Sequence, residues 1–136
     1  MYIARMPERF AIPITPTSAD IDGLGHVSNV SYLKWVVDVA LAHSAAVGWP
    51  VARYHDHGAA FMVRRHEIDY ISQVTLGETL RAETWVETWR PASCIRRTEL
   101  LRDGKVVVRA ATTWAMIGLS SGRPVRISDD LVALFS

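Results

Sequence analysis

The sequence predicts an α+β fold, in which an antiparallel sheet of about five strands wraps around one long central helix. One extended apolar segment of helical periodicity lies near the N-terminal end, and the later strand patterns follow it without a second long helix. Short turn signals separate these strands, and Asp103-Gly104 is the strongest indication of a hairpin. The chain has 136 residues and is 49% hydrophobic, so we expect a single domain over residues 1–136.

The first two predicted elements are a short strand and the long helix. Residues 10–15 form the strand, in which Pro13 removes a backbone donor and favours an edge or a strand end. Ser28 or Asn29 can cap the helix, and Gly48 is expected to end it. The stripe expected to face the core recurs at helical spacing and comprises Tyr32, Trp35, Val36, Val39, His43, Ala46 and Val47. Its other sides are apolar too, which predicts burial of the helix on more than one side.

The second half of the chain predicts four strands joined mostly by hairpins. A polar loop is expected first, over residues 53–58. The strands are expected over residues 61–71, 80–89, 95–101 and 106–117. A turn is expected over residues 90–93, and Ser128 can cap a short final helix.

Composition and charge argue against several classes of protein. The net charge is +1 and the basic runs are short pairs, Arg64-Arg65 and Arg96-Arg97, so no nucleic-acid partner is expected. The single cysteine, Cys94, excludes an intrachain disulfide and a cysteine metal cluster, and a packed thiol is expected. Residues 1–9 contain no apolar signal region, and no apolar run approaches the roughly 20 residues that cross a membrane. We therefore expect a cytoplasmic protein without a membrane partner.

The polar turn before the long helix carries the most informative chemistry. It places the carboxylate of Asp22, the imidazole of His26 and the carboxamide of Asn29 around the first turn of the helix. A helix start offers unpaired backbone N–H groups and a partial positive charge. A carboxylate beside such amides is a usable arrangement for acyl transfer, and Gly23 and Gly25 allow the backbone to turn tightly.

The same turn resembles a known family signature. Asp22-Gly23-Leu24-Gly25-His26-Val27-Ser28-Asn29, followed by Tyr32-Leu33, resembles the Asp-x-x-Gly-His-Val-Asn-Asn-x-x-Tyr-Leu motif of hotdog-fold acyl-CoA thioesterases, in the style of the 4-hydroxybenzoyl-CoA thioesterase-like family. Similarity continues through Gly48-Trp49-Pro50 and into the last predicted strand and tail. The resemblance implies a hotdog domain that hydrolyses an acyl-CoA thioester to a carboxylic acid and coenzyme A, with no metal and no other cofactor. It also implies a homodimer or a dimer-of-dimers homotetramer.

The resemblance assigns catalytic roles to three residues. Asp22 matches the catalytic carboxylate, as nucleophile on the thioester carbonyl or as general base for water. Asn29 matches the position whose backbone N–H polarises the thioester oxygen. His26 matches a histidine that plant-type acyl-carrier-protein thioesterases of the same fold place four residues after their aspartate, although Leu24 stands where those enzymes have an asparagine. Ser28 replaces the first asparagine of the family pair and can still cap the helix.

Other positions are candidates for substrate contact. The substrate-binding candidates are Gly25, Ser28, Tyr32, Arg90 and Ser93. Basic residues on or near the strand turns after Trp89 could meet the phosphates of coenzyme A, namely Arg90, Arg96, Arg97, Arg102 and Lys105.

Several alternatives remain open on the sequence alone. Asp22 could serve only as a turn residue, and His26 could hydrogen-bond within the turn. Asp38 is a carboxylate on an apolar helix, which fits a salt bridge, a dimer-contact hydrogen bond or the acid of another thioesterase branch. His55-Asp56-His57 suggests a metal but lacks a third ligand. The alternative functions are an acyl-carrier-protein thioesterase and a non-catalytic acyl-thioester-binding module.

Overall fold

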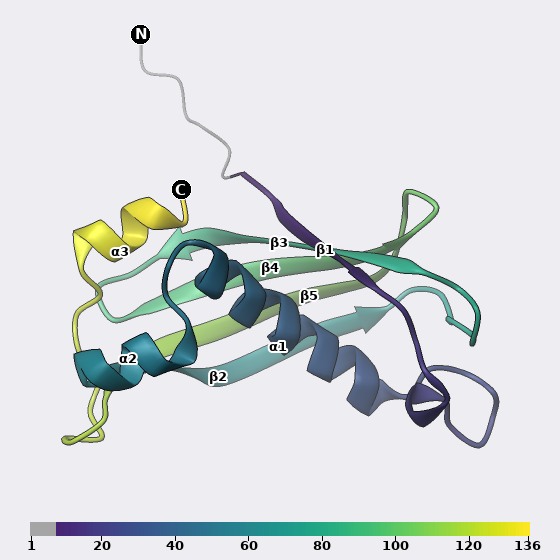
Figure 1. Ribbon diagram of the computed structural model, residues 1–136, viewed down its shortest axis with the longest axis horizontal. Coiled ribbons are helices and arrows are strands. Elements are labelled where there is room, and N and C mark those ends of the chain that lie inside the picture. The colour runs from purple at the N-terminus through teal and green to yellow at the C-terminus, as the bar shows by residue number, and fades with distance from the viewer. Residues whose placement is uncertain (1–7) are drawn as a thin grey trace, which may run out of the picture.

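The computed structural model describes residues 8–136, and it confirms the predicted architecture of one long helix against a five-stranded antiparallel sheet (Figure 1). The first seven residues, part of the segment considered for a signal, lie outside the described residues. The elements in chain order are β1 (Phe10–Ile14), the 3-10 turn η1 (Ser18–Asp20), α1 (Asn29–Ala46), α2 (Val51–His57), β2 (Ala59–Tyr70), β3 (Leu80–Trp89), β4 (Ser93–Arg102), β5 (Lys105–Gly118) and α3 (Asp129–Leu134). The strand order is β1-β3-β4-β5-β2, so β1 and β2 form the two edges.

The hairpins form where the sequence predicts them. Asp103 and Gly104 have φ values of 52° and 77°, which a two-residue turn of the Asp-Gly type requires, and they join β4 to β5. At the opposite end of the sheet, the Arg90 N–H donates to the Ser93 carbonyl at 2.8 Å and closes the turn from β3 to β4. The two turns therefore lie at opposite ends of the sheet (Figure 1).

The predicted helix is confirmed, with Ser28 as its cap. The Ser28 Oγ accepts from the Ser31 N–H, and Val47 and Gly48 follow the last helical turn. The buried side carries most of the expected stripe, namely Tyr32, Trp35, Val36, Val39 and His43, with Ala40, Ser31 and Ser44. Burial on more than one side is not found in the single chain, because Leu33 and Leu41 are 37% and 43% exposed.

We predict that Ser28→Ala lowers the free energy of unfolding by about 1 kcal/mol, because it removes the side-chain acceptor of the first helical turn. Urea denaturation followed by circular dichroism measures the change. Ser120→Ala is the matched control, since Ser120 is exposed on a turn and caps no helix. Equal stabilities of the two variants would contradict a stabilising role for this cap.

The prediction of a polar loop over residues 53–58 is wrong, because most of this segment lies in helix α2. The local sequence is polar, but Tyr54 is buried and its ring packs 5.0 Å from Trp49 and 5.7 Å from Phe61. This tertiary contact stabilises a short helix that local pattern alone does not reveal. Gly58 ends the helix with φ 90°, a left-handed conformation that favours glycine.

Within residues 8–136, no single helix is long and apolar enough to cross a membrane. The helices α1 and α2 reach that length and apolarity only together, and they are bent by 68° relative to each other.

A buried polar pair lies beneath the C-terminal half of α1. Arg96 Nη1 donates to His43 Nδ1 at 2.9 Å, and the two residues are 5% and 6% exposed. The His43 ring stacks on Phe10 with its centroid 4.9 Å away. Burial, and secondarily the Arg96 charge, lower the pKa of His43 from 6.5 to about 4. Cys94, on the same strand as Arg96, is a packed thiol as expected, and burial raises its pKa to about 11.

This pair predicts a loss of stability in mild acid. An unfolded histidine binds a proton below about pH 6.5, whereas folded His43 stays neutral until about pH 4. The free energy of unfolding should therefore fall as the pH drops from 6.5 to 4, by on the order of 3 kcal/mol. Urea denaturation at several pH values in this range measures how steeply the free energy of unfolding depends on pH. In His43→Gln the amide oxygen can still accept from Arg96 but cannot titrate, so this dependence should be weaker. The same pH dependence in the wild type and the variant would show that His43 does not cause it.

Candidate active site

Asp22 closes the turn that precedes α1. Its Oδ1 accepts from the backbone N–H of Leu24 at 2.9 Å and of His26 at 3.3 Å. The main chain closes the same turn, with the Asp22 N–H donating to the His26 carbonyl at 2.8 Å. Gly25 has φ 81°, which a non-glycine residue adopts at a cost. The carboxylate is thus held in place, is exposed in the single chain, and accepts no hydrogen bond at Oδ2 from residues 8–136.

The start of α1 directly follows this turn and offers free amides. Within residues 8–136, the N–H groups of Asn29 and Val30 have no acceptor, as expected for the first residues of a helix. Asn29 is exposed, and Ser28 beside it is half-buried and occupied as the helix cap. The predicted residues Asp22, Gly25, Ser28 and Asn29 therefore come together on one exposed turn. The arrangement combines a fixed carboxylate with backbone donors that can receive negative charge.

His26 lies in the same turn and is half-buried. Its imidazole makes no hydrogen bond within the described residues, so the structure does not assign it a bonding role in the turn. The next residue, Val27, is buried and donates its N–H to the Val74 carbonyl at 2.8 Å. Leu24, at the tip, is 82% exposed. The turn is therefore anchored at its base and open at its tip.

Asp20 is a positioning residue that the sequence analysis missed. Its carboxylate accepts from the Thr17 N–H at 2.8 Å and from the Ser31 hydroxyl at 2.7 Å. These bonds join η1 to the first turn of α1, across the turn that carries Asp22. The hydrogen bond from the Thr17 backbone is the main cause that lowers the pKa of Asp20. The Thr-x-x-Asp spacing from Thr17 to Asp20 is the sequence signal that could have revealed this capping interaction.

Tyr32 lies in the core rather than on the surface of the site. It is 3% exposed and packs in an edge-to-face contact with Trp35, at 5.7 Å between ring centroids. It also approaches Tyr70, at the end of β2, at 5.5 Å. Burial raises the pKa of the Tyr32 hydroxyl. This placement fits a residue that positions the helix start and does not fit direct contact with a substrate.

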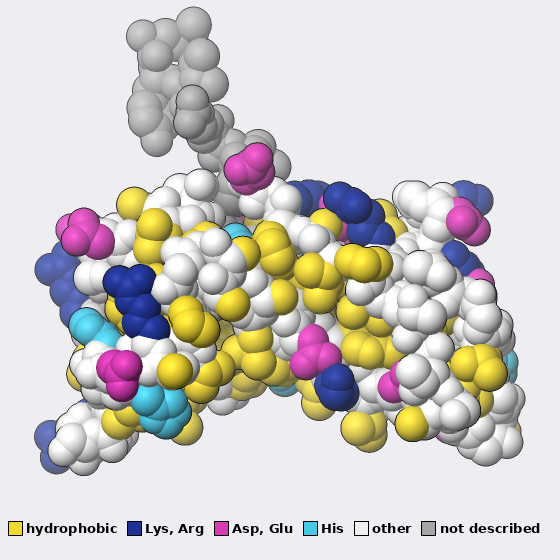
Figure 2. Space-filling model, viewed as in Figure 1, with side chains coloured by type: hydrophobic (Ala, Val, Ile, Leu, Met, Phe, Trp, Pro, Cys, Tyr) yellow, Lys and Arg dark blue, Asp and Glu magenta, His cyan; other side chains and the backbone are white. Residues whose placement is uncertain are grey.

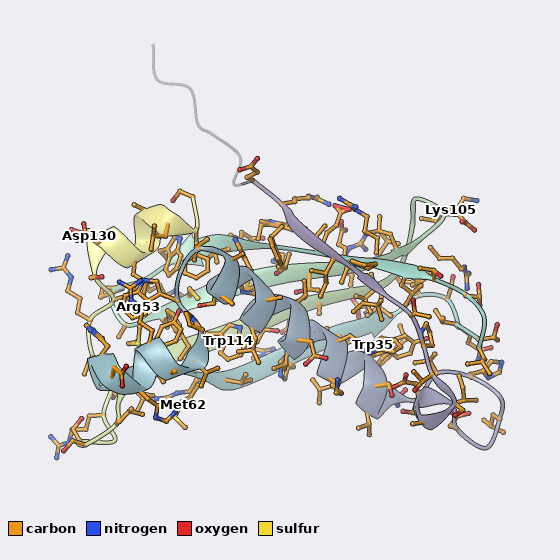
Figure 3. The ribbon with its side chains drawn as sticks, in the orientation of Figure 1. Trp35, Arg53, Met62, Lys105, Trp114 and Asp130 are labelled. Carbon is orange, nitrogen blue, oxygen red and sulfur yellow. The ribbon has the colours of Figure 1, made fainter. Side chains whose placement is uncertain are left out.

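Arg90 and Ser93 lie far from the Asp22 turn within one chain. They belong to the β3–β4 turn, whereas the loop before α1 that carries Asp22 lies at the other end of the sheet, which is also the end of the β4–β5 hairpin (Figures 1 and 3). Arg90 is exposed and Ser93 is half-buried. The structure therefore does not bring these two candidates together with Asp22 in a single subunit.

The other basic candidates are mostly occupied. Arg97 pairs with Glu87 at 2.6 Å, and Arg102 pairs with Glu78 at 3.0 Å. Arg96 is buried and cannot act as a surface contact for phosphate. Among the expected phosphate contacts, Arg90 and Lys105 are the exposed basic residues to which the described structure gives no ion pair.

The remaining alternatives lose support. Asp38 forms an ion pair with Lys34 at 2.7 Å, one helical turn away, as the salt-bridge reading predicted. His55 and His57 lie on α2, and the described residues contain no group of three ligands able to hold a metal ion. The Asp22 turn is therefore the strongest candidate for chemistry.

Comparisons with known proteins agree with this fold. Three solved structures illustrate the similarity. A DHNA-CoA thioesterase from Staphylococcus aureus is 18% identical, with a TM-score of 0.85 over 93% of this chain and 88% of that chain. Slr0204, a 1,4-dihydroxy-2-naphthoyl-CoA thioesterase from Synechocystis, is 15% identical, with a TM-score of 0.86 over 94% and 96%. The hypothetical protein SAV2348 from Staphylococcus aureus, solved in complex with CoA, is 15% identical, with a TM-score of 0.88 over 98% and 85%.

At these identities the structural likeness shows a shared fold. Among curated protein sequences, none matches this chain. The family itself is shown by a match of residues 16–135 to the thioesterase-like superfamily, which covers nearly the whole chain. The described fold, the motif at the helix start and this match agree, and the chain belongs to the thioesterase-like superfamily as a hotdog-fold thioester hydrolase.

Proposed function

We propose that this protein is an acyl-CoA thioesterase whose active site is built around Asp22 and the start of α1. The observation that carries the proposal is the fixed Asp22 carboxylate, with Oδ2 unused, beside the free N–H groups of Asn29 and Val30. Thioester hydrolysis develops negative charge on the carbonyl oxygen, and backbone amides at a helix start can stabilise that charge without rearrangement.

Two chemical routes use the same geometry. In the first, Asp22 removes a proton from water, the resulting hydroxide attacks the thioester carbonyl, and the sulfur leaves as coenzyme A thiolate. In the second, Asp22 itself attacks, releases the thiolate and forms an anhydride that water then cleaves. Both routes give a carboxylic acid and coenzyme A. His26 lies in the same turn and donates its backbone N–H to Asp22 Oδ1, and a role for its imidazole in either route is part of the proposal.

The site is completed by a second subunit. Within residues 8–136 the outer edge of β2 has no strand partner, and exposed strand edges are sites of strand pairing. One side of α1 carries an apolar stripe of the exposed Val30, Leu33 and Leu41 with the half-buried Val37 among them. Met62 and Val63 of β2 are also exposed, and hydrophobic side chains run across the face that carries α1 (Figure 2). We propose that these surfaces pair in a homodimer, which can associate further into a tetramer.

A two-fold axis through β2 brings the separated candidates together. Antiparallel pairing sets the start of β2 in one subunit beside the end of β2 in the other. The end of β2 lies near the helix start, because Tyr70 approaches Tyr32. The start of β2 lies near α2 and the β3–β4 turn, because Phe61 packs on Tyr54. Each Asp22 would then lie near the other subunit's turn with Arg90, where this cation can meet a phosphate of coenzyme A.

A panel of acyl thioesters tests the function. Release of free thiol from acyl-CoA substrates of different chain lengths, at matched protein concentrations, should identify at least one substrate that is turned over. The same acyl groups are then tested as thioesters of acyl carrier protein. Faster hydrolysis of these than of the CoA thioesters would indicate a carrier-protein thioesterase. Tight acyl-CoA binding without turnover of any substrate would instead indicate a non-catalytic binding module.

A further inference from the structure

A cavity of about 110 Å³ lies between the C-terminal half of α1, α2 and the inner face of the sheet. Its walls are rich in aromatic rings, including Trp49, Phe61, Trp89 and Trp114. The exposed side chain of Leu41 lies at its opening. A cavity of roughly 150 Å³ holds a benzene molecule, so this one suits a group of about four non-hydrogen atoms.

A cation without a counter-ion lies in the wall of this cavity. Arg96 is 5% exposed, and within residues 8–136 no carboxylate lies within ion-pair distance of it. Its Nη1 donates to His43 Nδ1 at 2.9 Å and to the Thr84 hydroxyl at 3.1 Å, and its guanidinium carbon lies 5.5 Å from the Phe135 ring. These contacts are to neutral groups. Burial lowers the pKa of Arg96 to about 10, so the side chain stays charged at neutral pH. A buried charge of this kind is unfavourable unless a group of opposite charge joins it.

A second buried donor lies on the same face of the sheet. The Nε1 of Trp114 is buried and has no acceptor within the described residues. Trp114 pairs with Cys94, two residues before Arg96 on β4, so Trp114 and Arg96 are diagonal neighbours on the sheet surface. Trp114 lines the same cavity as Ala40, Leu41 and Ser44, and Figure 3 shows it by the C-terminal half of α1.

The other polar groups of the cavity are already paired. The Ser44 and Tyr54 hydroxyls lie 2.7 Å apart, and the Ser44 hydroxyl also donates to the Trp49 carbonyl at 2.7 Å, which leaves the Tyr54 hydroxyl to donate to Ser44. The unmet hydrogen-bonding capacity is therefore donor capacity beside a positive charge. A carboxylate, which only accepts hydrogen bonds and carries a negative charge, matches both features, whereas an apolar chain end matches neither.

We propose that this cavity binds a free carboxylate at the far end of the acyl group, so that the preferred substrates are CoA thioesters of short dicarboxylic acids. The substrate class rests on the proposed function, because the cavity meets the thioester site only across the dimer. In one chain the cavity and the Asp22 turn lie at opposite ends of α1 (Figure 1). The two-fold pairing through β2 places the cavity of one subunit near the Asp22 turn of the other.

A binding experiment without catalysis tests the cavity directly. Hexanoate carries a carboxylate on an apolar chain, and 1-hexanol is its uncharged counterpart. The indole rings of Trp49, Trp89 and Trp114 line the cavity and provide an intrinsic fluorescence signal. Titration of this fluorescence gives a dissociation constant for each compound. Hexanoate should bind with an affinity at least about 10-fold higher than that of hexanol. Arg96→Met should abolish the difference, and equal hexanoate affinity in the wild type and in Arg96→Met would overturn the proposal.

A kinetic experiment then tests the substrate class. The wild type should hydrolyse adipyl-CoA with a kcat/KM at least about 10-fold higher than that for hexanoyl-CoA, and Arg96→Met should reverse this preference. Arg109→Met is the matched control, since Arg109 is an exposed arginine on the neighbouring strand and should leave the preference unchanged. If Arg96→Met does not fold, Arg96→Lys is used instead, because it keeps the charge but loses the planar guanidinium group. A weaker preference of Arg96→Lys for adipyl-CoA would support the same conclusion.

The two proposals can fail separately. Hexanoate binding that depends on Arg96, with no thioester turned over, would reject the thioesterase assignment and keep the anion site. Hydrolysis of both thioesters with equal kcat/KM in wild type and Arg96→Met would keep the thioesterase and reject the carboxylate site.

Discussion

Asp22→Asn should lower kcat for acyl-CoA hydrolysis about 1,000-fold while the protein remains folded and dimeric. The asparagine side-chain oxygen can still accept the hydrogen bonds that the Leu24 and His26 N–H groups donate to Asp22, so the turn keeps its shape. The amide, however, can neither remove a proton from water nor attack a thioester carbonyl. Both routes of the proposed mechanism are therefore blocked by one substitution.

The measurement is thiol release under single-substrate conditions, with circular dichroism and light scattering on the same sample. Asp38→Asn is the matched control, because Asp38 is a carboxylate on α1 that pairs with Lys34. It should retain activity within about two-fold of the wild type, since exposed ion pairs one helical turn apart contribute little. Unchanged hydrolysis in Asp22→Asn would remove Asp22 from the mechanism.

Leu33→Glu should convert the protein to a monomer and reduce hydrolysis about as strongly as Asp22→Asn. Leu33 lies in the middle of the exposed apolar stripe on α1, and a carboxylate there would have to be buried without a partner in the dimer. The monomer itself keeps its fold, because Leu33 makes up no part of the buried core of the single chain. Activity should be lost because, in the proposed dimer, each site draws residues from both subunits.

Size-exclusion chromatography with light scattering, beside the thiol-release assay, measures both effects. Leu134→Glu is the control: Leu134 is 45% exposed on α3, outside the stripe, and its replacement should leave mass and activity unchanged. A Leu33→Glu protein that is monomeric and fully active would show that one chain suffices for catalysis. A Leu33→Glu protein that remains a dimer would show that this side of α1 does not form the interface.

Local chemistry explains why much of this protein could be predicted. Ser28, Gly25 and Asp103-Gly104 act through the few residues around them, since caps and tight turns depend on local backbone geometry. The strand order along the chain and the helix start were readable for the same reason. Asp22 and Asn29 were found together because seven positions and one turn separate them.

Other features could not be read from local pattern. Helix α2 forms where the sequence is polar, because Tyr54 finds the rings of Trp49 and Phe61. Arg96 has the same strand parity as the buried Cys94, Thr98 and Leu100, which indicates a buried side chain. Charged residues are rarely buried, however, so its residue type favoured an exposed position.

The sequence by itself determined the α+β order of elements, the capped helix start and the turn that holds Asp22, since each follows from hydrogen bonds and dihedral preferences within a few residues. The tertiary structure alone decided that Arg96 is a buried cation in an aromatic cavity and that Arg90 lies at the opposite end of the sheet from Asp22. The physical reason is that burial and proximity depend on which faces of helix and sheet meet. Those contacts join residues far apart in the chain, which no local pattern encodes.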